Sequence, residues 1–254
     1  MASVKFGATL DGLRRSATEA DPAAGARVTR AVERYRAPVR VEVTGRAGVG
    51  RSAVIVALGP IAGGEPVETA ALDVPGAEDP ALTGELIVLV VCDPPRRADQ
   101  DVVRVAGDRV LVVLNKADTV ADRAVAAERA AEILGVPCLP VGARSGEGVD
   151  ELRIEVAERL AAVRARRSAA LLAELRAMTG TARVRDAVEE YLAGDEALTV
   201  AALPDQQRDV PGLALQRARA QRGRMNGGFD ARSTRGALAL HRRAVREWAR
   251  GELR

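Results

Sequence analysis

The sequence predicts an α/β protein with a mostly parallel sheet flanked by helices, followed by an α-helical C-terminal region. Two observations lead to this prediction. Strand-like and helical segments alternate through the middle of the chain, which is the pattern of βαβ units. Two of the strand-like segments, residues 86–92 and 109–115, are almost entirely apolar, as expected for strands of a parallel sheet that is covered on both faces.

The elements follow one another in a regular order. Residues 8–36 have the sparse apolar spacing of helices, with an interruption expected at the DPAAG sequence of residues 21–25. Apolar residues alternate with polar ones over residues 39–43, which predicts the first strand, and a helix is expected over residues 52–58. The remaining strands are predicted at residues 67–74, 86–92, 109–115 and 138–142, with helices at 98–105 and 120–134 between them.

The C-terminal part is predicted to be helical. One long helix is expected over residues 149–178, and shorter ones at 184–192, 213–222 and 233–250, separated by Pro204, Pro211 and the glycines near residue 227. We expect these helices to pack with the N-terminal ones into a bundle. The predicted division is therefore an N-terminal helical segment (1–37), an α/β domain (38–160) and a helical, Arg-rich C-terminal region (161–254).

The composition limits the class of protein. Apolar residues make up 47% of the 254 residues but aromatic residues only 2%, so we expect a packed core of aliphatic side chains. No apolar run approaches the length of about 20 residues that a membrane span requires, and the first residues lack the apolar core of a secretion signal. The two cysteines lie in strand-like runs, which does not suggest a disulfide framework. We expect a cytoplasmic protein, with peripheral membrane association left open.

A glycine-rich loop follows the first predicted strand. Its spacing is that of a phosphate-binding loop, G-x-x-x-x-G-K-[ST], except that Arg51 replaces the lysine, and it lies between a strand and a helix as such a loop must. The loop's backbone N–H groups would point at phosphate oxygens, and the Ser52 hydroxyl would bind Mg²⁺. The phosphate-binding residues are then Gly45, Arg46, Ala47, Gly48, Val49, Gly50, Arg51 and Ser52. The alternative is a tight strand-to-helix turn without a ligand.

A second motif, Asn-Lys-Ala-Asp at residues 115–118, ends the strand predicted at 109–115. Here the chain resembles the translation-factor-related class of P-loop GTPases, whose guanine-reading motif is N-K-x-D. The resemblance implies that Asp118 accepts two hydrogen bonds from guanine, that Asn115 ties this loop to the phosphate loop, and that Lys116 lays its aliphatic stem over the base. Lys116 is one of only two lysines among 38 basic residues, so composition does not explain it. An ordinary strand-to-helix cap is the alternative.

Further motifs continue the resemblance over about residues 38–160. The sequence LDVPG at residues 72–76 fits D-x-P-G, which implies that Asp73 holds Mg²⁺ through water and that the Gly76 N–H contacts the γ-phosphate. Gly-Ala-Arg at residues 142–144 replaces the family's S-A-K, so the Ala143 N–H would bind guanine O6, with Arg144 beside it. Residues 92–106 resemble the Era-like and bacterial dynamin-like branches. The resemblance thus implies GTP or GDP with Mg²⁺ as ligands.

Two departures from the family pattern concern catalysis. Arginine is wider and planar, so Arg51 keeps the charge of the missing lysine but not its geometry. Only 20 residues separate Ser52 from Asp73, and the single threonine among them, Thr69, lies inside a predicted strand. No glutamine follows Pro75 to orient a water. Because phosphoryl transfer depends on positioning and charge neutralisation, we expect slow GTP hydrolysis or none.

Three functional hypotheses follow from the motifs and departures. The leading one is a guanine-nucleotide-dependent switch, and its alternatives are a pseudo-GTPase interaction module without nucleotide and a dynamin-like GTP hydrolase activated by assembly. From Gln206 onward the chain holds 12 arginines and four acidic residues, so its last helix is either a bundle helix with a solvated Arg face or a basic surface for an anionic membrane or protein partner. Nucleic acid is not expected as a partner, because aromatic residues for base stacking are scarce.

Overall fold

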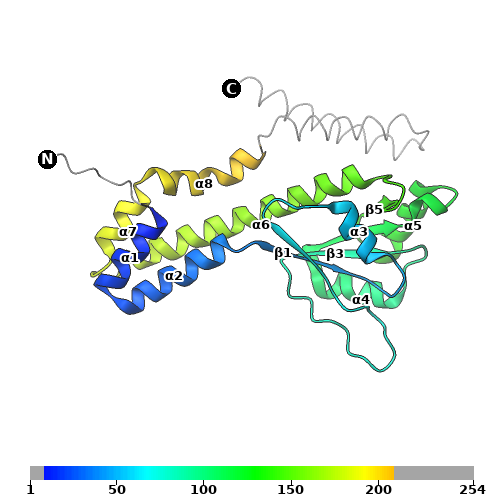
Figure 1. The fold of residues 1–254 in the computed structure, drawn as a ribbon, viewed down its shortest axis with the longest axis horizontal. Helices are drawn as coiled ribbons and strands as arrows, with labels where there is room; N and C mark the ends of the chain where they lie inside the picture. The colour runs from blue at the N-terminus through cyan, green and yellow to red at the C-terminus, as the bar shows by residue number, and fades with distance from the viewer. Residues whose placement is uncertain (1–8, 209–254) are drawn as a thin grey trace, which may run out of the picture. The chain divides into compact units, whose positions relative to one another are not determined.

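The computed structural model describes residues 9–208, which fall into two compact units (Figure 1). Residues 9–37 and 161–208 form a helical unit, and residues 38–160 form an α/β unit. Helix α6, Val149–Met178, has the bounds expected from the sequence and contributes its first part to the α/β unit and the rest to the helical unit. The helices predicted at 213–222 and 233–250 lie outside the described residues.

The α/β unit is built on a five-stranded sheet with the order β2-β1-β3-β4-β5, in which every neighbouring pair is parallel (Figure 1). β2 and β3 pair with opposite edges of β1. The chain therefore passes from β1 to the strand on one side, β2, and then crosses to the strand on the other side, β3. The carboxyl ends of β1 and β3 therefore border the crevice where α/β sheets place ligands. The strands are β1 Val39–Thr44, β2 Gly64–Glu68, β3 Leu86–Val91, β4 Val110–Asn115 and β5 Cys138–Val141.

Helices cover both faces of this sheet, as the apolar strands predict. All residues of β3 and β4 are buried. Alternate residues of these strands, beginning with Ile87 and Val110, pack in one cluster with α4, Arg97–Ala106, and α5, Arg123–Leu134. On the other face, α3, Arg51–Leu58, is joined to α6 by a hydrogen bond of 3.1 Å from Arg153 Nε to the Ala57 carbonyl.

The prediction of a strand at residues 67–74 is wrong. Strand β2 begins at Gly64, opposite Val39, and ends at Glu68. It is an edge strand whose residues are exposed or half-buried, so it lacks the alternating pattern of a half-buried strand. Pro66 is accommodated because an edge strand has one side free of ladder hydrogen bonds. The chain leaves the sheet after Glu68 and comes back beside the end of β1 at Leu72, which forms an isolated parallel bridge with Arg46.

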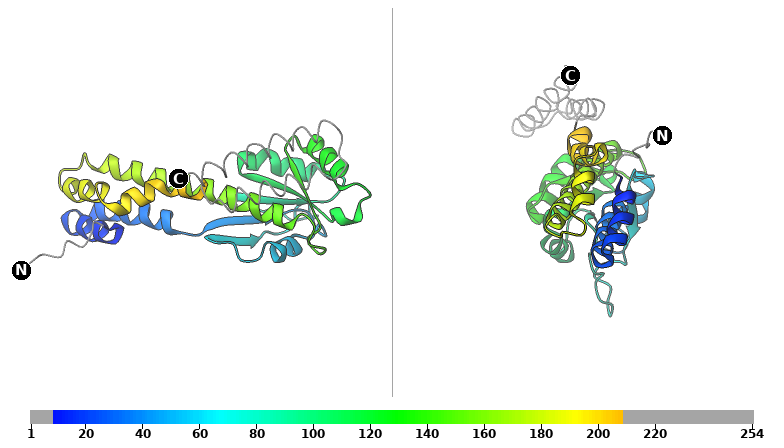
Figure 2. Two further views of the ribbon diagram at one scale, coloured as in Figure 1. Left: turned by 90° about the horizontal axis from the view of Figure 1, so that it is seen from above. Right: turned by 90° about the vertical axis from the view of Figure 1, so that its left-hand side faces the viewer.

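The helical unit combines helices from both ends of the described chain, as expected for a bundle. Helices α1, Leu10–Ala20, and α2, Pro22–Arg36, are drawn in blue and lie side by side (Figure 1 and Figure 2). Asp21 alone separates them, and its carboxylate accepts hydrogen bonds from Ala23 and Ala24, as an N-cap does. Their buried faces share one core with the second part of α6, with α7, Arg185–Leu192, and with α8, Asp195–Arg208.

Helix α8, Asp195–Arg208, was not predicted, because Pro204 was expected to separate helices rather than lie inside one. Proline removes one backbone hydrogen bond from a helix interior, at an appreciable cost. Tertiary packing offsets that cost here, since Ala197 and Val200 are buried in the core of the helical unit. None of the helices in the described part of the chain is both long and apolar enough to cross a membrane.

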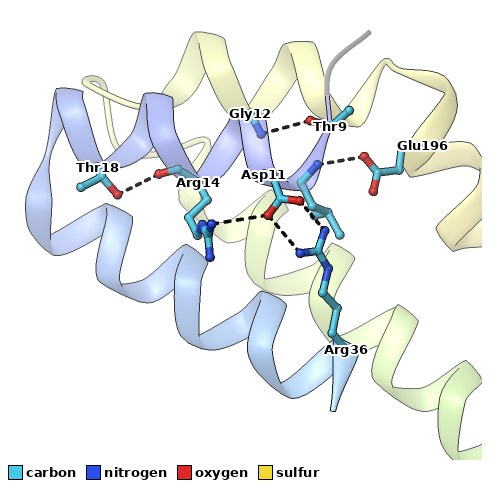
Figure 3. Close-up of polar contacts among 8 residues, drawn as sticks. Thr9, Asp11, Gly12, Arg14, Thr18, Arg36 and Glu196 are labelled. Atoms are coloured by element: carbon cyan, nitrogen blue, oxygen red, sulfur yellow. Dashed lines mark hydrogen bonds and ion pairs between the residues drawn. The ribbon is translucent and has the colours of Figure 1, made fainter. Parts of the chain in front are cut away.

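Polar contacts join the ends of these helices (Figure 3). Glu196 of α8 accepts a hydrogen bond of 2.8 Å from the backbone N–H of Leu10, the first residue of α1. Asp11 of α1 accepts two hydrogen bonds of 3.0 Å from Arg36 of α2, which hold the pKa of Asp11 below its usual value. These contacts therefore connect α1 to both α2 and α8 at its N-terminal turn.

Candidate functional site

The glycine-rich loop between β1 and α3 requires glycine at two positions. Gly45 and Gly50 have φ values of 150° and 93°. A Cβ at Gly45 would lie 2.3 Å from the Val90 carbonyl oxygen, and one at Gly50 would lie 2.4 Å from Asn115 Nδ2. No side chain fits at either position, so the loop can pack closely against the ends of β3 and β4 only with these glycines.

Two further glycines border open space. Gly48, in the same loop, and Gly76, after β2, both have a φ of 78°, and a Cβ at either would have no neighbour within 4 Å. Their backbones are thus accessible to a ligand. The Ser52 hydroxyl is exposed in the first turn of α3, where helix N–H groups favour anions.

Arg51, which replaces the lysine of the phosphate-loop pattern, turns toward the end of β2. Its Nη1 donates to the Thr69 carbonyl at 2.6 Å, and its Nη2 lies 3.5 Å from Glu68 Oε1. The side chain is 15% exposed. The guanidinium therefore adds positive charge beside the loop while it is held by backbone and carboxylate oxygens.

Arg46, the second residue of the loop, is held by α4. Its Nε donates to Asp99 Oδ2 at 3.1 Å, and Asp99 is fully buried. Asp99 also accepts a hydrogen bond of 2.8 Å from the backbone N–H of Arg96, the N-cap residue of α4. The side chain of Arg46 therefore fixes the loop to α4, which leaves only its backbone N–H for the predicted phosphate contact.

Asn115, the last residue of β4, connects two loops. Its Nδ2 donates to the Val49 carbonyl at 2.9 Å, and its Oδ1 accepts from the Ala143 N–H at 3.2 Å. The side chain is buried, so both hydrogen bonds are shielded from water. The glycine-rich loop and the loop after β5 are therefore held by one amide group, and the Ala143 N–H predicted for guanine O6 is engaged in this bond.

Lys116 adds a second connection from the same strand end. It has a φ of 61°, and its Nζ donates to the Gly48 carbonyl at 2.8 Å. The side chain is exposed along its course. Its aliphatic stem therefore passes from the end of β4 to the glycine-rich loop, and the ammonium stays accessible to water.

Asp118 lies in the short 3-10 helix Ala117–Thr119, next to the loop after β5. A Cβ at Gly142 would be 3.1 Å from the Asp118 carboxylate. Asp118 is exposed, and within residues 9–208 its carboxylate accepts no hydrogen bond. Arg144, in the same loop as Gly142, is also exposed. No other residue of the described part of the chain therefore occupies this carboxylate.

The two predicted Mg²⁺ residues each offer one exposed oxygen group. Asp73 follows Leu72, whose N–H donates to the Gly45 carbonyl at 3.1 Å, so Asp73 comes close to the start of the glycine-rich loop. Ser52 lies in the first turn of α3. The described residues contain no cluster of three His, Cys, Asp or Glu side chains that could hold a metal. This pair fits Mg²⁺ only together with phosphate oxygens and water, which is the usual way that Mg²⁺ is bound.

Sequence reasoning missed two residues that support the loop. Asp99 could have been found from the sequence as an acidic residue in the first turn of a helix. Its pairing with Arg46 could not, because the two residues lie far apart in the chain. Cys92, which follows β3, places its Sγ 3.8 Å from the Val49 carbonyl, and burial raises the pKa of this thiol. Cys92 therefore packs beneath the loop, in surroundings that disfavour its thiolate form.

No protein-family model matches this chain, and no curated protein matches it.

Proposed function

We propose that the α/β unit is a P-loop GTPase-like domain of the Era-like or dynamin-like type, which binds GTP or GDP with Mg²⁺ and acts as a slow or non-hydrolysing switch. One observation carries this proposal. Asn115 is hydrogen-bonded to Val49 in the glycine-rich loop and to Ala143 after β5, while Asp118 beside it has no partner among residues 9–208. A phosphate-type loop and a free carboxylate are thereby held at one edge of the sheet.

Guanine is the base that this carboxylate suits. The two oxygens of Asp118 can accept hydrogen bonds from the N1–H and the 2-amino group of guanine, whereas adenine has neither donor in that position. A site built to pair with two donors rejects a base that lacks them, because the carboxylate is then desolvated without compensation. Lys116 supplies the apolar stem that would cover one face of the base.

The phosphates would occupy the open space beside Gly48, at the N-terminus of α3. Gly76 would contribute a second backbone N–H from the loop after β2. Ser52 and Asp73, with phosphate oxygens and water, would hold Mg²⁺, which neutralises phosphate charge. Arg51 would add its charge from the side of β2, without the reach of a lysine.

The same residues argue for slow turnover. The Thr69 hydroxyl is already engaged within the protein, because it lies 2.9 Å from Thr44 Oγ1 and donates to the Ala70 carbonyl. Pro75 and Ala77 carry no group that could orient an attacking water. We expect GTP hydrolysis no faster than about 10⁻³ s⁻¹, since intrinsic rates are low even in GTPases that keep these groups.

A pseudo-GTPase module without nucleotide is the second candidate. It is favoured because two groups that a nucleotide would use are already bonded to other parts of the protein. The Ala143 N–H donates to Asn115, and Arg51 is held by Thr69 and Glu68. Under either function, we propose that the Arg-rich residues beyond 208 contact a partner protein or an anionic membrane. Those residues lie outside the described part of the chain.

Nucleotide titration tests the proposal. Calorimetric titrations of the full chain with GDP, a non-hydrolysable GTP analogue, ADP and ATP, each with Mg²⁺, should show saturable binding of both guanine nucleotides. Adenine nucleotides should bind at least about 100-fold more weakly. Absence of binding by all four would favour the pseudo-GTPase.

Phosphate release separates the switch from an assembly-activated hydrolase. Rates should stay low with and without anionic liposomes, and a large rise on liposomes would support the dynamin-like alternative. Arg51→Lys tests whether the loop limits turnover, because lysine restores the compact charge. Faster hydrolysis by this variant would show that it does.

A further inference from the structure

Gly142 lies beneath two oxygen-bearing side chains that come from different loops. A Cβ built at Gly142 would be 2.2 Å from Ser145 Oγ and 3.1 Å from the Asp118 carboxylate. The position is buried, so a side chain there could not turn outward to avoid both. The absence of a side chain at residue 142 therefore leaves room for a hydroxyl group next to the carboxylate.

The loop itself sets the position of Ser145. The Gly142 N–H donates to the Glu147 carbonyl at 2.8 Å, and the Gly146 N–H donates to the Gly142 carbonyl at 2.8 Å. Gly148 packs so closely against Pro140 that a Cβ there would lie 2.3 Å from the Pro140 carbonyl oxygen. These contacts close the loop tightly on both sides, so the hydroxyl is presented from a fixed backbone.

The Ser145 hydroxyl has a poor acceptor at present. It donates to the Gly142 carbonyl at 3.2 Å, which is long for an O–H···O bond, and that carbonyl already accepts the Gly146 N–H. The nearby Asp118 carboxylate accepts no hydrogen bond within the described chain. A hydrogen bond to a charged acceptor is stronger than one to a neutral carbonyl, so Asp118 is the better partner.

We propose that Ser145 is a positioning residue for base selectivity. Its hydroxyl donates to the Asp118 carboxylate when a guanine nucleotide binds, and so fixes the plane of the carboxylate against the two donors of the base. Without this donor the carboxylate keeps its charge but rotates freely, and its two hydrogen bonds to guanine weaken. This inference rests on the proposed function, because it concerns the group that would read the base.

Nucleotide titrations of variants of the full chain test it. Ser145→Ala should weaken GDP binding about tenfold, because a hydrogen bond to a charged group is lost, and should leave ADP binding unchanged, because adenine does not use Asp118. Ser145→Thr should keep GDP affinity near that of the wild type, since it keeps the hydroxyl. Ser16→Ala, an exposed serine of α1 in the other unit, is the matched control and should change neither affinity.

A double substitution tests the geometry at Gly142. Gly142→Ser alone should lower the melting temperature, because its Cβ collides with Ser145 Oγ. In Gly142→Ser/Ser145→Ala the hydroxyl moves to position 142 and the collision with Ser145 Oγ is removed, which leaves the closer of the remaining contacts at 3.1 Å from the Asp118 carboxylate. This double variant should regain most of the GDP affinity that Ser145→Ala loses, which a merely structural role for Ser145 does not predict.

The outcomes separate the inference from the proposed function. GDP binding that depends on Asp118 but is unaffected by Ser145→Ala would overturn the inference and leave the function standing. Equal loss of GDP and ADP affinity in Ser145→Ala would also overturn it, since that result indicates damage to the loop. If the wild-type chain binds no guanine nucleotide, both proposals fail together.

Discussion

Arg51 keeps the charge of the lysine that it replaces but acquires partners that its motif does not indicate. Its guanidinium bonds to the Thr69 carbonyl and lies 3.5 Å from Glu68. A planar guanidinium has five donors and can hold a carbonyl and a carboxylate together, which an ammonium does less well. A nucleotide phosphate, if bound as proposed, would therefore compete with Glu68 for this charge.

Glu68→Gln should strengthen GDP binding about two- to fivefold, because it removes the competing charge of a partly exposed ion pair. Calorimetric titration measures the change, and the gain should disappear when Arg51 is also replaced by Ala. Glu65→Gln, an exposed glutamate of the same strand, is the control and should have no effect. Weaker binding by Glu68→Gln would show that Glu68 helps Arg51 to reach the phosphate.

The candidate site was predictable where its residues are consecutive in the chain. Spacing predicted the glycine-rich loop, and the resemblance of residues 115–118 to N-K-x-D predicted Asn115, Lys116 and Asp118. The partners of Arg46 and Arg51 were not predictable, because Asp99 and Thr69 belong to other elements. The same holds for Ser145, whose proximity to Asp118 depends on the closure of a loop.

The helices and buried strands were largely predictable because their patterns are strong. The α6 bounds agree with the expected range, and β3 and β4 coincide with the apolar runs. Strand β2 and helix α8 were not, for opposite reasons. The first is an exposed edge strand with no periodic pattern, and the second tolerates a proline because Ala197 and Val200 anchor it in a core.

The connection from β1 to α3 depends on glycine for space as well as for backbone conformation. Gly50→Ala should cost at least about 2 kcal/mol more in the free energy of unfolding than Gly135→Ala. Both glycines have left-handed backbone conformation, but a Cβ at Gly50 would lie 2.4 Å from Asn115 Nδ2, whereas a Cβ at Gly135 would have no neighbour within 4 Å. Urea unfolding measures both values. Equal costs would mean that the Asn115 side chain moves aside freely.

At the scale of the whole molecule, each unit has its own core. The core of the helical unit joins residues from both ends of the described chain, from Leu10 to Val200. The predicted candidate site residues all lie between Gly45 and Arg144, within the α/β unit. Stability of the helical unit and ligand binding by the α/β unit should therefore respond to different substitutions.

Leu175→Ala should destabilise the helical unit by about 2–5 kcal/mol, because Leu175 is fully buried in its core. Hydrogen exchange followed by mass spectrometry should show faster exchange in α1, α2 and α7, with β3 and β4 unchanged. GDP affinity should change less than about twofold. Leu198→Ala, at a leucine of α8 that is 63% exposed, is the matched control. Faster exchange in β3 and β4 would show that the two units unfold together.

The carboxylate of Asp118 is the group that we propose recognises guanine. Titration of GDP and XDP into the wild-type chain and Asp118→Asn tests it most directly, because the amide offers one donor and one acceptor in place of two acceptors. Asp118→Asn should lose at least about 100-fold in GDP affinity and bind XDP in preference. Asp108→Asn, before the other end of β4, should behave as the wild type. Guanine preference that survives in Asp118→Asn would contradict the claim.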